Sequence, residues 1–138
     1  MKKVFIILLI IPFLTAFTLT KTKEDFIGKW TGEDKGDIGS IIFDKEGYAT
    51  FMMGDQVFGG KEFIMSGKKG NMTYSINTET TPIQIDFVVE KIESGEEKRL
   101  LGIVKFINDN SIKLALSFNS AEGRPKSFDE SIILNRVD

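Results

Sequence analysis

The amino-acid sequence of 138 residues predicts an all-β fold, an antiparallel meander of about eight to nine strands that closes into a barrel. Three observations lead to this prediction. From about residue 28 onward apolar and polar residues alternate, turn residues interrupt the alternation about every 8 to 12 positions, and no later stretch of ten residues keeps a helical period. Closure into a barrel removes the sheet edges that would otherwise pair with other chains. A two-sheet β-sandwich is the alternative that the same strand spacing allows.

The first half of the predicted sheet consists of short strands separated by turns, several of which contain glycine. A short helical turn at residues 22–27 precedes them, with Thr22 as its cap and Asp25 near its start. Glycine suits such turns because it adopts backbone angles that other residues avoid. We expect strands at residues 28–33, 38–44, 48–53, 61–66 and 71–77, with turns at 45–47, 59–60, 68–70 and 80–82.

The second half of the sequence alternates most clearly. One face of the strand at residues 83–92 is expected in the core and the other mostly in water, because its apolar residues occupy every second position. These residues are Ile83, Ile85, Phe87 and Val89. Further strands are expected at residues 100–107, 112–118 and 131–137, joined by an acidic turn at 93–97, a tight reversal at 108–110 and a loop containing residues 123–125.

The N-terminal segment has the layout of a secretory signal peptide. Lys2 and Lys3 precede an unbroken apolar run over residues 4–14, and mostly small residues follow up to residue 20. The run is shorter than the roughly 20 residues of a membrane-spanning helix, and an uncleaved N-terminal anchor is the alternative. We expect a signal peptide within residues 1–20 to be removed on export to a bacterial periplasm or exterior, with cleavage after Ala16, Thr18 or Thr20. The remaining single domain, residues 21–138, is expected to have no stable membrane insertion.

The composition argues against several kinds of chemistry. The chain has no Cys and no His, which excludes disulfides and thiolate nucleophiles and removes the usual general base and the commonest zinc ligands. A net charge of −2 is unsuited to an electrostatic nucleic-acid binder. No pair of carboxylates stands out from ordinary surface acids. We therefore predict a protein that is not an enzyme, that uses no cofactor or metal, and that binds no nucleic acid.

Two segments at opposite ends of the predicted sheet resemble lipocalins and related calycin barrels. Gly28-Lys29-Trp30 has the G-x-W pattern of that group, and Arg136 lies on the final strand, where the group often places an arginine against the tryptophan. The resemblance implies that Trp30 and Arg136 form a structural pair, in which the guanidinium lies over the indole and closes the narrow end of the barrel. A ligand-stacking role for Trp30 is the alternative interpretation.

The C-terminal half is similar to a family of small uncharacterised secreted domains with lipocalin-like character. The similar pieces keep their order and spacing over roughly residues 28–136, whereas residues 55–69 match no pattern of that family. Because the family carries no established activity, this resemblance implies a fold and no chemistry. The similar pieces are residues 81–86, 101–104, 110–116 and 123–128.

The large apolar residues leave two interpretations of the barrel interior open. A barrel of about eight strands is either just filled by its side chains or holds one small ligand. The many Phe residues favour a filled interior, whereas flexible, polarisable Met side chains suit an adaptable apolar pocket. Arg124 lies on a loop that Pro125 stiffens, where it could present its guanidinium to an anion or cap strand carbonyls. The candidate ligand-binding residues are Phe51, Met53, Met65, Met72, Tyr74 and Arg124.

The acids at residue 86 and in the turn at residues 93–97 are interpreted as solvent-exposed charges without a binding or catalytic role. Asp86 is expected on the solvent side of its strand, and the acids of residues 93–97 lack the ligand offsets of a dedicated calcium loop. Two functions therefore stay open. The chain is expected to be either an exported lipocalin-like domain that binds a small apolar or amphipathic ligand, or a structural or protein-interaction domain with a filled core.

Overall fold

The computed structural model describes residues 21–32 and 39–137. The predicted signal peptide, residues 1–20, lies outside the described residues. Two short 3-10 helices, η1 (Lys23–Phe26) and η2 (Ser120–Glu122), accompany a sheet of ten strands. The strands are β1 (Gly28–Gly32), β2 (Ser40–Phe43), β3 (Ala49–Met53), β4 (Gln56–Gly59), β5 (Phe63–Met65), β6 (Lys68–Asn77), β7 (Ile83–Lys91), β8 (Glu97–Asn108), β9 (Ser111–Ser117) and β10 (Ile132–Val137).

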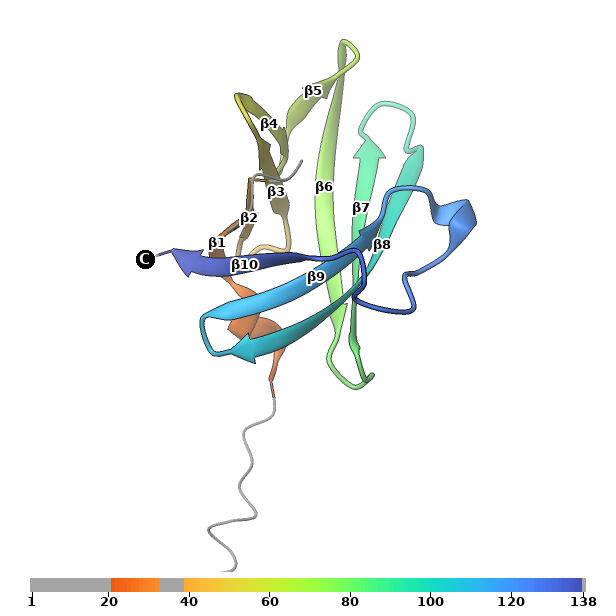
Figure 1. Cartoon of the computed structure of the whole chain (residues 1–138). Helices are drawn as coiled ribbons and strands as arrows, with labels where there is room; N and C mark the ends of the chain where they lie inside the picture. Colours follow the sequence, from red (N-terminus) through yellow and green to blue (C-terminus); the bar gives the residue numbers. More distant parts are fainter. Residues whose placement is uncertain (1–20, 33–38, 138) are drawn as a thin grey trace, which may run out of the picture.

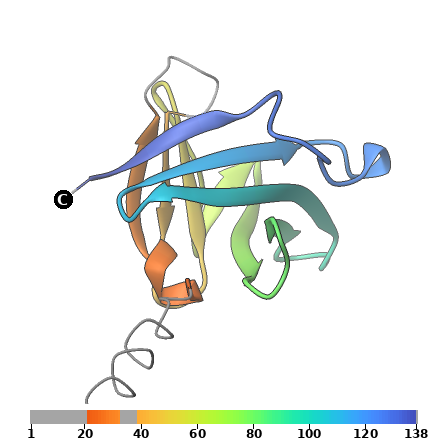
Figure 2. The ribbon, with the colours of Figure 1, turned by 60° about the horizontal axis from the view of Figure 1, so that its bottom comes forward.

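The sheet is an antiparallel meander that curls round until its edges meet. Its strand order is β4-β3-β2-β1-β10-β9-β8-β7-β6-β5. Strand β1 pairs with both β2 and β10, so the first and last strands lie side by side (Figure 1). The two edge strands, β4 and β5, follow one another in the chain and meet as the sheet curls (Figures 1 and 2). The predicted all-β barrel is therefore confirmed, in a nearly closed form, over the two-sheet sandwich.

A short seam joins the two sides of the curled sheet below β4 and β5. We define the seam as residues 44–48 and 59–60 on one side and residues 72–74 on the other. The backbone N–H of Met72 donates to the carbonyl of Gly60 at 2.9 Å, and the N–H of Tyr74 donates to the carbonyl of Gly47 at 3.0 Å. The seam therefore closes the barrel with a few backbone hydrogen bonds instead of a full ladder.

The structure differs from the sequence prediction where the edge strands lie. Strand β4 was not predicted, and residues 68–70, predicted as a turn, begin β6. The reversal lies at Ser66 and Gly67 instead, which have φ angles of 51° and 79°. Lys68, Lys69 and Gly70 together have the composition of a turn. The two lysines are nevertheless strand residues, because the end of β6 extends into solvent and needs no alternation of apolar and polar residues there. With β4 included, the sheet has ten strands instead of eight or nine.

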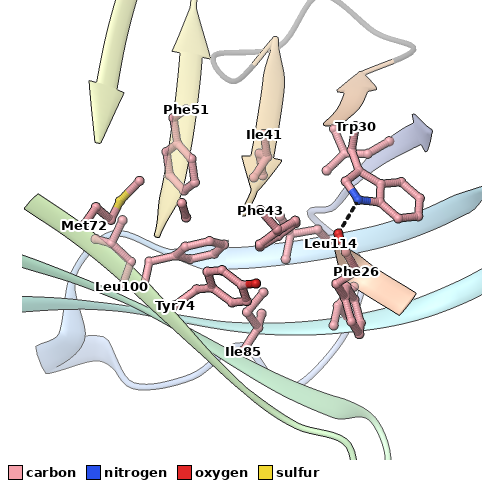
Figure 3. Close-up of a cluster of buried hydrophobic side chains, with 14 of the residues drawn as sticks. Phe26, Trp30, Ile41, Phe43, Phe51, Met72, Tyr74, Ile85, Leu100 and Leu114 are labelled. Carbon is pink, nitrogen blue, oxygen red and sulfur yellow. Dashed lines mark hydrogen bonds between the residues drawn. The ribbon is translucent and has the colours of Figure 1, made fainter. Parts of the chain in front are cut away.

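The core fills the end of the barrel beside η1, which we call the closed end. Trp30 and Phe26 lie on one side of this cluster, and the indole N–H donates to the carbonyl of Phe26 at 2.9 Å (Figure 3). Among the residues that the structure describes, no polar or charged residue is fully buried. The largest fully buried side chains are Trp30, Phe26, Phe43, Phe51, Phe87, Ile41, Met72, Ile85, Ile112, Leu114, Leu134 and Val104.

Arg136 lies across the closed end. Its guanidinium carbon is 4.2 Å from the centre of the Trp30 ring, and the two residues are partners in the β1–β10 register. The same guanidinium donates to the carbonyl of Ile27 at 3.0 Å and to that of Asp25 at 2.6 Å. Arg136 therefore ties η1 and the start of β1 to the last strand while it covers the indole.

Replacing Arg136 by Lys is expected to destabilise the fold by about 2 kcal/mol, because an ammonium keeps the charge but cannot match the planar fork that reaches two carbonyls. The measurement is urea unfolding followed by Trp fluorescence. Arg99→Lys is the matched control. Arg99 is half exposed and has a single contact at 3.4 Å to Asp86, so it is expected to change stability by less than about 0.5 kcal/mol. Equal effects of the two substitutions would contradict the anchoring role of Arg136.

Replacing Gly59 by Ala is expected to destabilise the seam. A Cβ there would lie 2.5 Å from the carbonyl oxygen of Ala49 and 2.6 Å from the terminal methyl of Met72. Gly47→Ala is the control, because Gly47 has a similar φ of 98° but open space around the added carbon, whereas Gly59 has a φ of 109°. We expect Gly59→Ala to cost about 2 kcal/mol more than Gly47→Ala in urea unfolding. Similar losses would show that backbone strain, and not crowding at the seam, decides the outcome.

Candidate functional site

An open cavity of about 700 Å³ lies at the end of the barrel away from η1, which we call the open end. The surface of the cavity is mostly apolar, with charged residues at its margin. Figure 1 shows that β4, β5, the end of β7 and the start of β8 lie at the end of the barrel away from η1. The lining residues are Phe51, Met53, Phe58, Met65, Val89, Lys91, Glu96, Glu97, Lys98, Leu100 and Phe118.

Inward-facing residues of three strands, β3, β7 and β8, form the floor of the cavity. Phe51 and Met53 are two positions apart on β3, so both side chains point to the same face of the sheet. Val89 on β7 and Leu100 on β8 are nearly buried. The ring of Phe51 packs edge-on against Phe87 at 4.8 Å, below the cavity. The floor of the cavity is therefore continuous with the packed core.

The edge strands cover one side of the cavity. The rings of Phe58 on β4 and Phe63 on β5 pack edge-on with centres 4.6 Å apart, and Met65 follows Phe63 on the same face of β5. Val57 and Ile64 alternate with these residues and are 61% and 64% exposed. The two edge strands thus present one apolar face to the cavity and a second one to solvent.

Charged residues form the rim, which we define as Lys91, Glu96, Glu97 and Lys98. The ammonium of Lys91 lies 3.3 Å from a carboxylate oxygen of Glu96, across the β7–β8 turn. Lys98 pairs with Val89 in the β7–β8 register, so it lies on the face that looks into the barrel. An apolar interior bounded by ionic groups can take an amphipathic molecule, with its apolar part inside and its polar part at the rim.

Three of the candidate residues from the sequence come together in this cavity, and two others lie below it. Phe51, Met53 and Met65 line the cavity. Met72 and Tyr74, which are 0% and 5% exposed, are packed in the core and do not belong to the cavity lining. Figure 3 shows Met72 beside Phe51 and Leu100, at the boundary between the core and the cavity.

Arg124 lies on the outer wall of the barrel, away from the cavity. Its guanidinium is 2.7 Å from a carboxylate oxygen of Asp86, 2.9 Å from the carbonyl of Gly102 and 3.3 Å from that of Ile85. This is the carbonyl-capping alternative that the sequence allowed. Asp86 was expected in water and does face outward, but Arg124 and Arg99 cover it to 19% exposure. Arg124 therefore fastens the loop between β9 and β10 to the sheet.

Sequence reasoning missed several cavity residues. Phe58, Val89, Leu100 and Phe118 line the cavity but were not among the candidate binding residues. Phe58 lies on the strand that was not predicted, because Val57 and Phe58 are adjacent apolar residues and this short segment shows no alternation. The other three were recognised as apolar positions of strands, and nothing in a period of two says how far along the barrel axis a residue lies.

Within the described ranges, two features of other functional classes are absent. No group of three or more Asp, Glu, His or Cys residues is placed to hold a metal ion. No helix in that part of the chain combines the length and the apolar character of a membrane span.

The environment of Tyr74 gives the seam a pH dependence. Burial raises the pKa of its phenol above the ordinary value of 10.0, and the nearby carboxylates of Asp44 and Glu24 raise it further. The neutral hydroxyl donates to the carbonyl of Asp44 at 2.8 Å. The folded state therefore favours the protonated phenol.

We expect the stabilising effect of this protonated phenol to be complete below pH 10 and to be lost as the pH rises toward the raised pKa. The unfolded chain ionises Tyr74 first and then binds fewer protons than the folded chain, so the free energy of unfolding decreases with pH in this window. Urea unfolding between pH 8 and about pH 11 should show a steeper decline for the native sequence than for Tyr74→Phe. Parallel declines in the two proteins would contradict this assignment.

The described residues thus form a nearly closed barrel of ten antiparallel strands with an apolar cavity at one end. No family model, no curated protein and no solved structure matches this chain.

Proposed function

We propose that the chain is an exported, lipocalin-like binding protein that takes a small apolar or amphipathic molecule into the cavity at the open end of the barrel. One observation carries the proposal: a cavity of about 700 Å³ is lined mainly by aromatic, Met and aliphatic side chains and opens to solvent. Pockets for small molecules typically measure about 300–1,000 Å³ and are mostly apolar. Burial of apolar surface supplies the affinity, at about 25 cal/mol per Å².

The character of the lining also supports binding. Met53 and Met65 have flexible, polarisable side chains that adapt to different apolar shapes. Phe58 and Met65 come from edge strands that do not pair with each other in the sheet, so the side wall of the cavity is not fixed by a continuous ladder. An adaptable wall above a rigid floor suits the capture of an apolar molecule of variable shape.

The lipocalin-like and exported parts of the proposal have separate support. The G-x-W tryptophan and the last-strand arginine, which resemble lipocalins, lie against each other at 4.2 Å in an antiparallel meander barrel whose first and last strands pair. Export rests on the basic start and the apolar run of residues 1–20. An exported carrier would meet its ligand outside the cytoplasm.

A second candidate function, a protein-interaction domain, is favoured by the outer face of the edge strands. Val57 on β4 and Ile64 on β5 are the two most exposed large apolar residues among those described. Exposed apolar side chains on edge strands are typical of surfaces that pair with other chains. This function would need no occupied cavity, so the following experiment separates the two.

Replacing Met53 by Gln should weaken the binding of a neutral apolar probe, N-phenyl-1-naphthylamine, by about tenfold, because a polar amide replaces a thioether in the apolar lining. Met52→Gln is the matched control. Met52 precedes Met53 on β3, points to the other face of the sheet and does not line the cavity. We expect Met52→Gln to change the affinity by less than twofold. The measurement is a fluorescence titration of the exported protein.

Native mass spectrometry of protein purified from its own host complements the titration. A bound small molecule that leaves on denaturation is the expected result. Protein that is consistently bare, and that also fails to bind the probe, would refute the proposed function and favour the interaction domain.

A further inference from the structure

The rim of the cavity is chemically asymmetric, although it contains two acids and two bases. The asymmetry arises from the alternation of strand β8. Leu100 is nearly buried and points into the barrel, so Lys98, two positions earlier, points the same way. The register partner of Lys98 on the neighbouring strand β7 is Val89, which also points into the barrel. Lys98 therefore extends the inner wall of the cavity toward solvent.

Neither acid of the rim forms an ion pair with Lys98. Glu97 borders the cavity, but as the register partner of Glu90 it belongs by alternation to the opposite face of the sheet from Lys98. Glu96 is engaged by Lys91 at 3.3 Å. Within the described residues, no carboxylate lies within ion-pair distance of the Lys98 ammonium.

Lys91 is the second inward base. It lies two positions after Val89 on β7, at the last position of the strand, and it lines the cavity together with Lys98. The aliphatic stems of two lysines thus continue the apolar wall, and their ammonium groups mark its upper limit. A molecule whose apolar part fills the cavity would place its head group beside these two cations.

We propose that the ligand is a small amphiphile with an anionic head, whose charge is held at the rim by Lys98 and, secondarily, by Lys91. This inference rests on the proposed function and specifies its ligand class. Lys98 forms no ion pair with a described carboxylate, whereas the ion pair with Glu96 weakens the contribution of Lys91. The head group stays partly hydrated, so the rim selects by the sign of the charge and not by a fixed hydrogen-bond pattern.

The test compares three probes with the same twelve-carbon chain: dodecanoate, dodecanol and dodecyltrimethylammonium, each titrated below its micelle concentration by displacement of the neutral fluorescent probe. Lys98→Gln is expected to weaken dodecanoate binding by about fivefold and to leave dodecanol within twofold. Lys98→Glu should weaken dodecanoate further and strengthen dodecyltrimethylammonium. The effect of Lys98→Gln on dodecanoate should shrink when the ionic strength is raised from about 0.01 M to 0.5 M.

Two further variants complete the design. Glu96→Gln releases Lys91 from its ion pair and is expected to strengthen dodecanoate binding by about threefold. Lys45→Gln is the control for a general change of net charge, because Lys45 is an exposed lysine in the turn between β2 and β3 and does not line the cavity. It should leave all three affinities within twofold.

The outcomes distinguish the inference from the function on which it rests. If dodecanol binds but substitution of Lys98 moves the three affinities alike or not at all, the anionic-ligand inference is wrong and the binding function stands. If none of the three probes binds, both are refuted. Opposite responses of dodecanoate and dodecyltrimethylammonium to Lys98→Glu would support the inference, because a loss of local structure would weaken both.

Discussion

The rest of the structure depends on the way in which the sheet closes at the seam. The two edges of this meander come together, and they meet where the backbone of Gly59 and Gly60 lies against β6. No Cβ fits at Gly59, and the carbonyl of Gly60 accepts from the N–H of Met72. Only glycine allows two backbone segments to approach so closely, because it has no Cβ. The hydrogen bonds stop there, and β4 and β5 continue beyond the seam without pairing with each other.

Incomplete closure and strand number together explain why the interior is both filled and hollow. Barrel diameter grows with strand number, and about eight strands give an interior that side chains just fill. Ten strands leave more room. Aromatic residues occupy it at the closed end, where Phe43 packs against Phe26, Tyr74 and Phe87. At the open end the side chains leave space between them, and the cavity remains.

The fold class followed from the sequence because its strongest signal is local. The alternation in β7 and β9 and the turns between them specify strands and faces without knowledge of their partners. The prediction failed where local composition and tertiary pairing disagree. Residues 68–70 read as a turn, yet in the structure Gly70 is a buried strand residue whose absent Cβ lets the carbonyl of Glu90 approach.

The candidate site was less predictable, since its position depends on depth along the barrel axis. Met72 and Tyr74 share the inward face with Phe51 and Met53, and the sequence pattern cannot distinguish them. Only the stagger of the strands puts Tyr74 in the core and Met53 at the cavity. Arg124 was ambiguous for a related reason. Its partner Asp86 is 38 residues away in the chain, and no periodicity connects a loop to a strand at that separation.

In the proposed binding mode, the charged groups of the protein lie at the rim of the cavity and not in the core. The described core contains no buried polar or charged residue, so a ligand's ionic group has no partner inside the barrel, where an unpaired charge would be costly. The ammonium of Lys98 can remain hydrated while its methylene stem covers apolar surface, which is a stable arrangement even without a ligand. A head group that binds there exchanges little water and gains a modest electrostatic energy. The rim would therefore determine which amphiphile is retained, and the apolar lining would determine how tightly, a division suited to a carrier that must also release its ligand.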